Sequence, residues 1–148
     1  QRQMCIRDRA TALSDDDGDG NPLVFEFLFG GNPTGRESLS PATPSGALSG
    51  ASLLGLDALL PIDAGKNYPI FDVLILRDRR GITLSPRASG DLSFTEDPPF
   101  RPIQIGTPSP EGSFDRYRYL ILPPTGTEPP TSGYLRLDID YSALPAGP

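Results

Sequence analysis

The residues best suited to chemistry in this sequence are the carboxylates of one acidic segment, SDDDGDGNPLVFEFLFGGNP, at residues 14–33. Aspartates stand at every second position, a glycine follows, and a glutamate lies within the next apolar run. This is the order of the calcium-loop pattern D-x-[DN]-x-[DN]-G-x5-E, in which alternate residues of a tightly curled loop point inward and a helical glutamate closes the cage. The sequence therefore predicts a Ca²⁺ site with the ligands Asp15, Asp17, Asp19, Asn21 and Glu26.

Two positions of this loop depart from the best calcium loops. Leu23 stands where a polar residue is usual, and Pro22 lacks the N–H through which paired loops bridge one another. We therefore expect a single loop of weak affinity, about 10⁻⁴ to 10⁻³ M. The alternative is a solvated acidic turn that caps a helix N-terminus, where carboxylates are favourable without any metal. The metal is favoured, because an unrelated acidic turn need not place both Gly20 and Glu26 correctly.

A short helix must position the glutamate. Residues 23–29 are apolar except for Glu26, Pro22 suits the first turn of a helix, and Gly30 followed by Pro33 makes a strong stop. Such a helix has about two turns, which is too short to persist alone in water. It must pack against the rest of the protein.

Most of the remaining chain has the pattern of short strands. Residues 34–52 are rich in Gly, Ser, Pro and Thr, which indicates a linker or a loosely laid surface strand. The expected strands after it are residues 70–76, 82–88, 92–95, 101–105, 115–122 and 134–141. The first is almost continuously apolar and should be central, with RDRRG as a hairpin turn to the second, whereas the third and fourth are bracketed by prolines and should be edges.

The fold class expected from this pattern is mostly β. No helical period separates the strands, so we predict a small antiparallel β-sandwich of jelly-roll or immunoglobulin-like size, or a small barrel, preceded by the calcium loop and one short helix. The domain boundaries follow as residues 10–33 for the loop and helix, 34–52 for the linker, and 53–148 for the β-sandwich.

The first nine residues, QRQMCIRDR, resemble a translated sequencing adapter, the transposon-end primer of library preparation. They contain the only Cys and the only Met of the chain. They also contain three of the 13 Lys and Arg residues and one of the 19 Asp and Glu residues. Without these nine residues the formal charge changes from −6 to −8, because 10 basic and 18 acidic residues remain. We expect an internal or C-terminal fragment of a longer, metagenomic sequence. Its acidity argues against nucleic acid or an anionic membrane as partner, and no apolar run is long enough for membrane insertion.

The acidic segment is also similar to a known family of sequences. It resembles the D-x-DGDG segment near the C-termini of large secreted proteins of environmental bacteria, akin to thrombospondin type-3 and dockerin calcium loops. In those proteins the loop is followed by a β-rich module that contains an S-x-DL stretch and, near its end, an FLRL strand. The similar segments here are ASGDLSF at residues 88–94 and GYLRLDI at residues 133–139, in the same order. The family's asparagine after the proline is replaced by Leu23. The resemblance implies a calcium-stabilised, non-catalytic C-terminal structural module, secreted or at the cell surface, whose partners are upstream domains of the same polypeptide.

Catalysis is the first competing function. Without His, and without Cys beyond the adapter-like residues, most nucleophilic triads and transition-metal sites are excluded. Glycosidase-like carboxylate pairs remain conceivable at Asp138 with Asp140 and at Glu96 with Asp97. The first pair should alternate outward on a strand and the second lies in a proline-rich loop, so we predict that the protein is not an enzyme.

A carbohydrate-binding or adhesin-like surface module, recognising a cell-surface glycan or protein, is the second competing function. Exposed aromatic side chains would carry it, and the candidates are Tyr68, Tyr117, Tyr119 and Tyr134. Two of them share a strand face with Ile121, which predicts burial, and the chain has no Trp. Cross-strand ion pairs with Asp138 and Asp140 are expected for Arg116, Arg118 and Arg136. A dockerin-type interaction is disfavoured, because dockerins have two loops.

Overall fold

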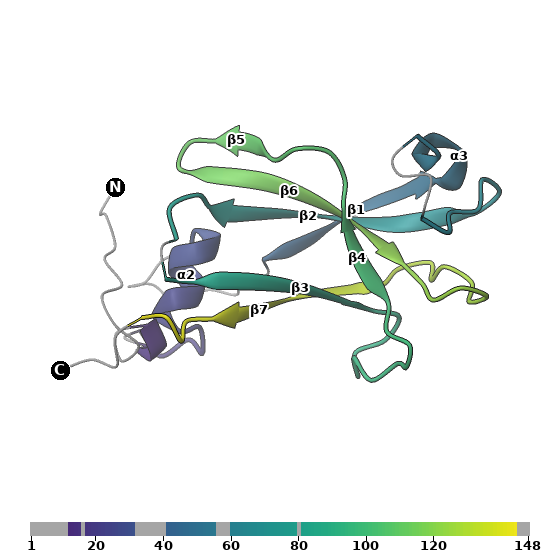
Figure 1. Cartoon of the computed structure of the whole chain (residues 1–148). Helices are drawn as coiled ribbons and strands as arrows, with labels where there is room; N and C mark the ends of the chain where they lie inside the picture. Colours follow the sequence, from purple (N-terminus) through teal and green to yellow (C-terminus); the bar gives the residue numbers. More distant parts are fainter. Residues whose placement is uncertain (1–11, 16, 32–40, 56–59, 80, 145–148) are drawn as a thin grey trace.

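The computed structural model describes residues 12–15, 17–31, 41–55, 60–79 and 81–144 (Figure 1). The adapter-like residues 1–9, Asp16 and Pro33 lie outside these ranges. The two labelled helices are α2 (Leu23–Phe29) and α3 (Gly50–Leu53). The strands are β1 (Ala42–Ser49), β2 (Asn67–Leu76), β3 (Thr83–Ser89), β4 (Arg101–Gln104), β5 (Ser109–Glu111), β6 (Phe114–Leu122) and β7 (Tyr134–Asp140).

The strands form two antiparallel sheets, which confirms the mostly β fold and is compatible with a small β-sandwich. The large sheet has the order β1-β2-β6-β4, with β5 also paired to β6. The small sheet consists of β3 and β7. Strand β2 pairs with β1 on one side and with β6 on the other, so the expected central position of its apolar run is confirmed.

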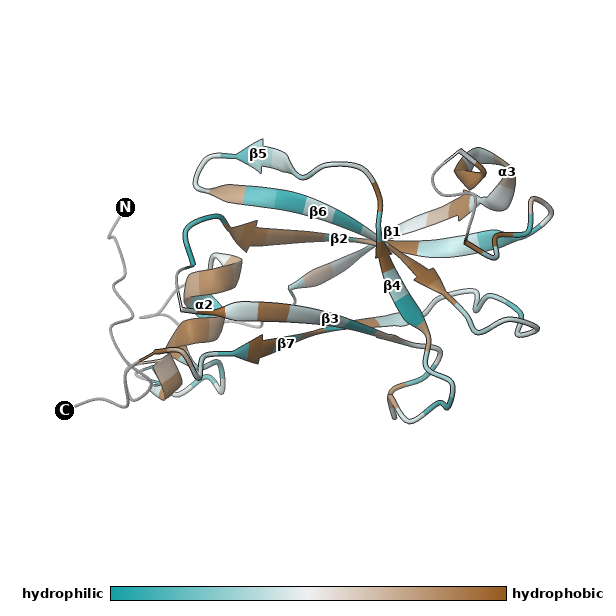
Figure 2. Ribbon diagram, in the orientation of Figure 1, coloured by the Kyte–Doolittle hydropathy of each residue, from teal (hydrophilic) through white to brown (hydrophobic). Residues whose placement is uncertain are grey.

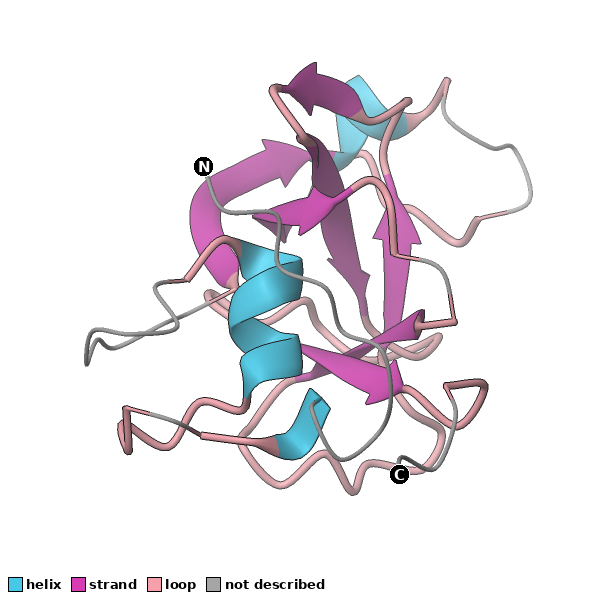
Figure 3. Ribbon diagram, turned by 90° about the vertical axis from the view of Figure 1, so that its left-hand side faces the viewer, coloured by secondary structure: helices cyan, strands magenta, loops and turns pink. Residues whose placement is uncertain are grey.

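The core lies between the two sheets, and α2 closes one end of it. The main cluster of buried residues contains Val24, Leu28 and Phe29 of α2, Val73 of β2 and Leu137 of β7. Figure 2 shows the apolar character of α2 and β2, and Figure 3 shows α2 running across the end of the sandwich, from the large sheet to the small one. The helix that is too short to exist alone is therefore stabilised by burial against both sheets.

The ends of α2 agree with the prediction from the sequence. The helix begins after Pro22, which has an extended backbone, and ends at Gly30, whose φ of 80° is the left-handed conformation. The Gly30 and Gly31 amides both donate to the Glu26 carbonyl, so backbone groups cap this carbonyl without a side chain. Glycine takes this conformation at little cost, which explains the sharp stop.

Two expected features of the β-region are wrong. The segment RDRRG does not form a hairpin, because β2 and β3 belong to different sheets and the chain crosses from one sheet to the other here. Both edges of β2 are already paired, which leaves no place for β3 beside it. Residues 92–95 are turn and coil rather than a strand, and their serine and threonine hydroxyls bond locally instead of joining a ladder.

The segment expected to be a linker or a surface strand contributes to the large sheet. Its residues 42–49 form the edge strand β1, whose register with β2 shifts between Pro44 and Ala47. The sheet therefore begins before residue 53, the boundary expected from composition. Residues 34–40 lie outside the described ranges.

Ion pairs join the central strands, but the partners differ from those expected. Arg118 of β6 pairs with Asp72 of β2, with 2.8 Å between Nε and Oδ1, and Ser45 donates to the same carboxylate at 3.0 Å. Arg116 pairs with Glu111 of β5 at 2.6 Å. The two β6 arginines were expected to reach the aspartates of β7, and this was wrong because β6 and β7 lie in different sheets.

The remaining arginine of that prediction lies on β7 itself. Arg136 pairs with Asp138 two residues along the same strand, with 2.8 Å between Nε and Oδ1. The pair is therefore formed with one of the two expected aspartates, but within the strand rather than across strands. Asp140 instead accepts the Ser142 amide at 2.9 Å.

Replacing Leu28 should test the role of α2 in the core. Its side chain is fully buried, so Leu28→Ala leaves a cavity between the helix and both sheets. We expect a loss of about 2 to 5 kcal/mol in the free energy of unfolding, measured by urea titration. Leu92→Ala removes the same atoms from a side chain that is 75% exposed, and should change stability by less than about 0.5 kcal/mol. Equal losses in the two variants would contradict the packing described here.

Acid unfolding should report on Asp72. The Arg118 guanidinium holds the pKa of Asp72 below its ordinary value of 3.8, with a further contribution from Ser45. The ion pair therefore stabilises the fold above pH 3.8, and this contribution is lost as the pH falls through the lowered pKa. Asp72→Asn should cost about 1 kcal/mol at pH 7, and the difference from the wild type should shrink below pH 3.8. Urea titrations at several pH values measure this, with Glu111→Gln as the exposed control, whose loss should be smaller. A difference independent of pH would exclude the ion pair as its cause.

Candidate metal centre

Three aspartates converge at the N-terminal side of α2. One carboxylate oxygen from each of Asp15, Asp17 and Asp19 lies within 4.8 Å of the others. Three carboxylates at this separation could hold a metal ion, and their oxygens are hard ligands. The three predicted aspartates therefore lie close together, and their role as metal ligands stays a prediction.

The loop is curled by hydrogen bonds from its own amides to these side chains. Asp15 accepts the Gly18 amide at 2.9 Å through Oδ1 and the Gly20 amide at 3.0 Å through Oδ2. Asp19 accepts the Asn21 amide at 2.8 Å. Both glycines have positive φ, 69° and 92°, which lets the backbone turn tightly enough for these bonds. The same turns bring alternate side chains to one side of the loop.

The surroundings of Asp17 disfavour its ionised form. Burial raises the pKa of its carboxyl, and the negative charges of Asp19 and Asp15 raise it further, against a hydrogen bond from the Asp19 amide that lowers it. Its Oδ2 atom is fully buried. A bound cation would stabilise the ionised form of this cluster.

The other two predicted ligands lie closer to the helix. Asn21 is half-buried, and its amide donates to Asp19 as described above. Glu26 is only 2% exposed, and its Oε1 atom is fully buried. Among the described residues, Glu26 does not belong to the group whose ligand atoms all lie within 4.8 Å of one another.

The loop is joined to α2 by backbone contacts that side-chain patterns do not reveal. The Leu23 amide donates to the Ser14 carbonyl at 2.7 Å, which closes the loop across the aspartate cluster. The N-cap of α2 is Pro22, and no side chain caps it. The aspartates thus bond to amides of their own loop, which differs from the alternative in which an acidic turn caps the helix.

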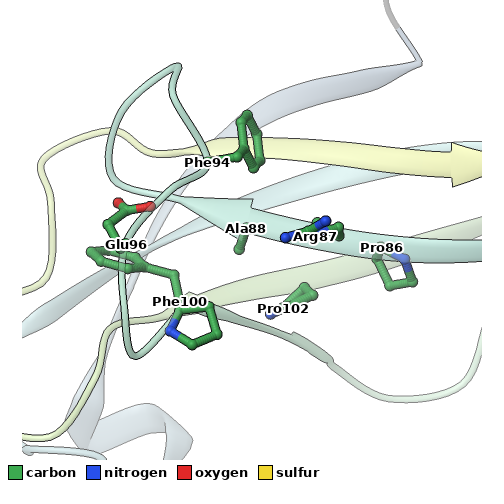
Figure 4. Close-up of a pocket in the computed structure, with 8 residues that line it drawn as sticks. Pro86, Arg87, Ala88, Phe94, Glu96, Phe100 and Pro102 are labelled. Carbon is green, nitrogen blue, oxygen red and sulfur yellow. The ribbon is translucent and has the colours of Figure 1, made fainter.

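Three of the four carboxylates that could have supported hydrolysis, Glu96, Asp138 and Asp140, have structural contacts. Glu96 accepts the Ser89 hydroxyl at 2.6 Å and the Gly90 amide at 2.7 Å, which ties the loop after β3 to the end of that strand. The Ser89 bond is the main cause that lowers the Glu96 pKa. Figure 4 shows this carboxylate at a shallow pocket with Phe94 and Phe100. Asp138 and Asp140 are held by the β7 contacts given above.

The tyrosines proposed for glycan recognition are mostly covered. Tyr68 is 2% exposed and Tyr119 is 8% exposed, as core residues would be. Tyr117 is half-buried and stacks on Tyr119, with 6.3 Å between the ring centroids. Tyr134 is the most exposed of the four at 38%. The described residues therefore offer no platform of several exposed tyrosines.

No helix in the described part of the chain has both the length and the apolar character needed to cross a bilayer. Comparison with protein-family models, with curated proteins and with solved structures gives no match to this chain. The acidic loop and the helix that it precedes are therefore the features of this molecule that point to a function.

Proposed function

We propose that this chain is a non-catalytic structural module in which one Ca²⁺, bound by the acidic loop, fixes α2 across the end of the β-sandwich. The observation that carries the proposal is the convergence of the Asp15, Asp17 and Asp19 carboxylates within 4.8 Å, directly before the helix that closes the core. The ligands of the proposed site are these three aspartates, Asn21 through its backbone carbonyl, and Glu26.

The donor set supports calcium over other metals. Every proposed ligand is an oxygen, and the sequence contains no His. Carboxylate and carbonyl oxygens suit Ca²⁺ and Mg²⁺, but Mg²⁺ requires a near-ideal octahedral cage, whereas Ca²⁺ accepts the larger and less regular set that a flexible loop provides.

The position of the loop connects metal binding to the core. The backbone bond between Leu23 and Ser14 spans the loop, and Leu28 lies between the two sheets one turn further along the helix. A cation that reduces the repulsion among the aspartates favours the curled loop over open conformations. It would therefore favour the docked position of α2 as well.

The proposed setting is a larger exported bacterial protein, with upstream domains of the same polypeptide as partners. The resemblance of residues 15–33 to thrombospondin type-3 and dockerin calcium loops supports this setting. A non-catalytic role is supported by the contacts of Glu96, Asp138 and Asp140, whose carboxylates tie together loops and strands.

Thermal unfolding with calcium and with chelator tests the proposal. At a free calcium concentration ten times the dissociation constant, binding should stabilise the fold by about 1.4 kcal/mol. This corresponds to a rise in Tm of about 3 to 8 °C. Magnesium at the same concentration should have a smaller effect. An equal Tm in calcium and in chelator would contradict the proposal.

Asp17→Ala makes this test specific to the loop, because it removes the ligand oxygens, whereas the loop pattern accepts asparagine at this position. The variant should lose the rise in Tm with calcium, because a charged ligand is removed. In chelator it should be at least as stable as the wild type, because the crowded charge of Asp17 disfavours the metal-free fold. Glu128→Gln removes one charge from a side chain that is 80% exposed, and should keep the full response to calcium. A general loss of stability in Asp17→Ala, with the calcium response retained, would exclude Asp17 as a ligand.

A further inference from the structure

Strand β7 forms an edge of the small sheet that contains neither a proline nor a bulge. It pairs with β3 over its whole length and, within the described residues, with no other strand. Figure 1 shows β7 as the outer strand of this sheet. Exposed edges have unpaired N–H and C=O groups that can pair with another chain, and proteins commonly block them with proline or a bulge.

The other edge strands carry such protection. Prolines lie in each of them, at Pro44 of β1, Pro86 of β3, Pro102 of β4 and Pro110 of β5. Strand β1 also has a register irregularity. The sequence of β7, YLRLDID, contains no proline, and its register with β3 is unbroken. Among the described edge strands, β7 alone is therefore regular enough to accept another strand along its full length.

The proline of β3 determines which backbone groups of β7 point outward. Pro86 lies opposite Leu137 and has no N–H to donate. The hydrogen-bonded pairs with β3 are therefore those of the residues on either side, Arg136 and Asp138, because such pairs alternate along an antiparallel ladder. The N–H and C=O groups of Leu135, Leu137 and Ile139 consequently face the open edge.

A second β7, antiparallel and related by a two-fold axis at Leu137, matches these groups. Leu137 then pairs with its own copy, and Leu135 pairs with Ile139, so every outward N–H meets an outward C=O. Arg136, which lies between Leu135 and Leu137, is then opposite Asp138 of the other copy. This is a non-hydrogen-bonded pair, in which the two side chains are close together and opposite charges attract. The strand is thus self-complementary in hydrogen bonding and in charge.

We propose that two copies of this chain associate through their β7 edges, as an antiparallel pair with its two-fold axis at Leu137. The interface joins the two small sheets into one continuous four-stranded sheet. Within one copy Arg136 is bonded to Asp138, and its guanidinium lies 4.6 Å from the centroid of the Phe94 ring. The two-fold pairing would place this ion pair against the same pair of the other copy, with unlike charges opposite each other. The inference does not depend on calcium binding.

The association is expected to be weak and reversible. One strand pair buries less surface than a standard stable interface, and two molecules with a formal charge of −6 repel each other. A dimer is therefore sought at concentrations up to about 1 mM, where weak contacts of this size become populated.

Charge exchange on β7 tests the inference by sedimentation velocity over a range of concentrations. The wild type should form a reversible dimer. Arg136→Asp and Asp138→Arg should each raise the dissociation constant about tenfold or more, because both cross-strand pairs become repulsive. An equimolar mixture of the two variants should dimerise again, because the aspartates of one variant then lie opposite the arginines of the other. Arg116→Asp makes the same change of charge on the large sheet, and should dimerise as the wild type does.

Three outcomes would overturn the inference: a wild type that stays monomeric throughout, single variants that dimerise as well as the wild type, or a mixture that fails to recover. Arg136→Asp also loses the contact with Phe94, which could destabilise the fold. Thermal melting of each variant is therefore the control that it is folded. If that variant does not fold, Tyr134→Asp replaces it, because Tyr134 would lie opposite Asp140 of the other copy. Its dimer should be weakened, and it should recover when mixed with Asp140→Lys.

Discussion

The burial of one short apolar helix between two sheets is the interaction on which the rest of this structure depends. A two-stranded sheet such as β3 and β7 is marginal in water by itself, and the inner face of the large sheet needs a cover. Helix α2 contacts residues of both sheets in the main core cluster, with Leu28 and Phe29 among those buried. Each of the three parts therefore depends on the other two, and the loop before α2 lies at the point where they meet.

The carboxylates of the protein divide into two groups by what surrounds them. Asp72 and Glu96 accept bonds from an arginine, from hydroxyls or from amides, and these donors hold their pKa values low. Asp72 joins strands that are distant in sequence, and Glu96 joins a loop to the end of the strand just before it. Asp17 has the opposite surroundings, with two other carboxylates nearby and a raised pKa. A cluster of this kind is costly unless positive charge is added, and this distinguishes the acidic loop from the rest of an acidic surface.

The features predicted correctly from the sequence are those fixed by residues close together in the chain. The bounds of α2 follow from Pro22 and Gly30, and the aspartate cluster follows from alternate positions in one tight loop. The alternation in residues 134–141 predicted β7, in which Leu137 is buried and Arg136 is exposed. In each case the pattern lies within one element, so no knowledge of the neighbouring strand is needed.

The features that the sequence did not predict depend on which distant strands become neighbours. The RDRRG turn has ordinary hairpin chemistry, yet both sides of β2 are taken by strands from elsewhere in the chain. The partners of Arg118 and Arg116 follow from the same topology. Strand β5 could not be predicted from its own sequence, because it has only three residues and one of them is a proline, which is unfavourable in a strand.

The pairing of β3 with β7 has a consequence for how the chain reaches this structure. The ladder joins Ser89 to Tyr134 at one end and Thr83 to Asp140 at the other, with three strands of the large sheet lying between them in the sequence. Closing so long a segment costs entropy before any ladder contact repays it. We therefore expect the small sheet to be assembled late in folding, on a large sheet that is already formed, and a nascent chain to remain incomplete until its last strand has been synthesised.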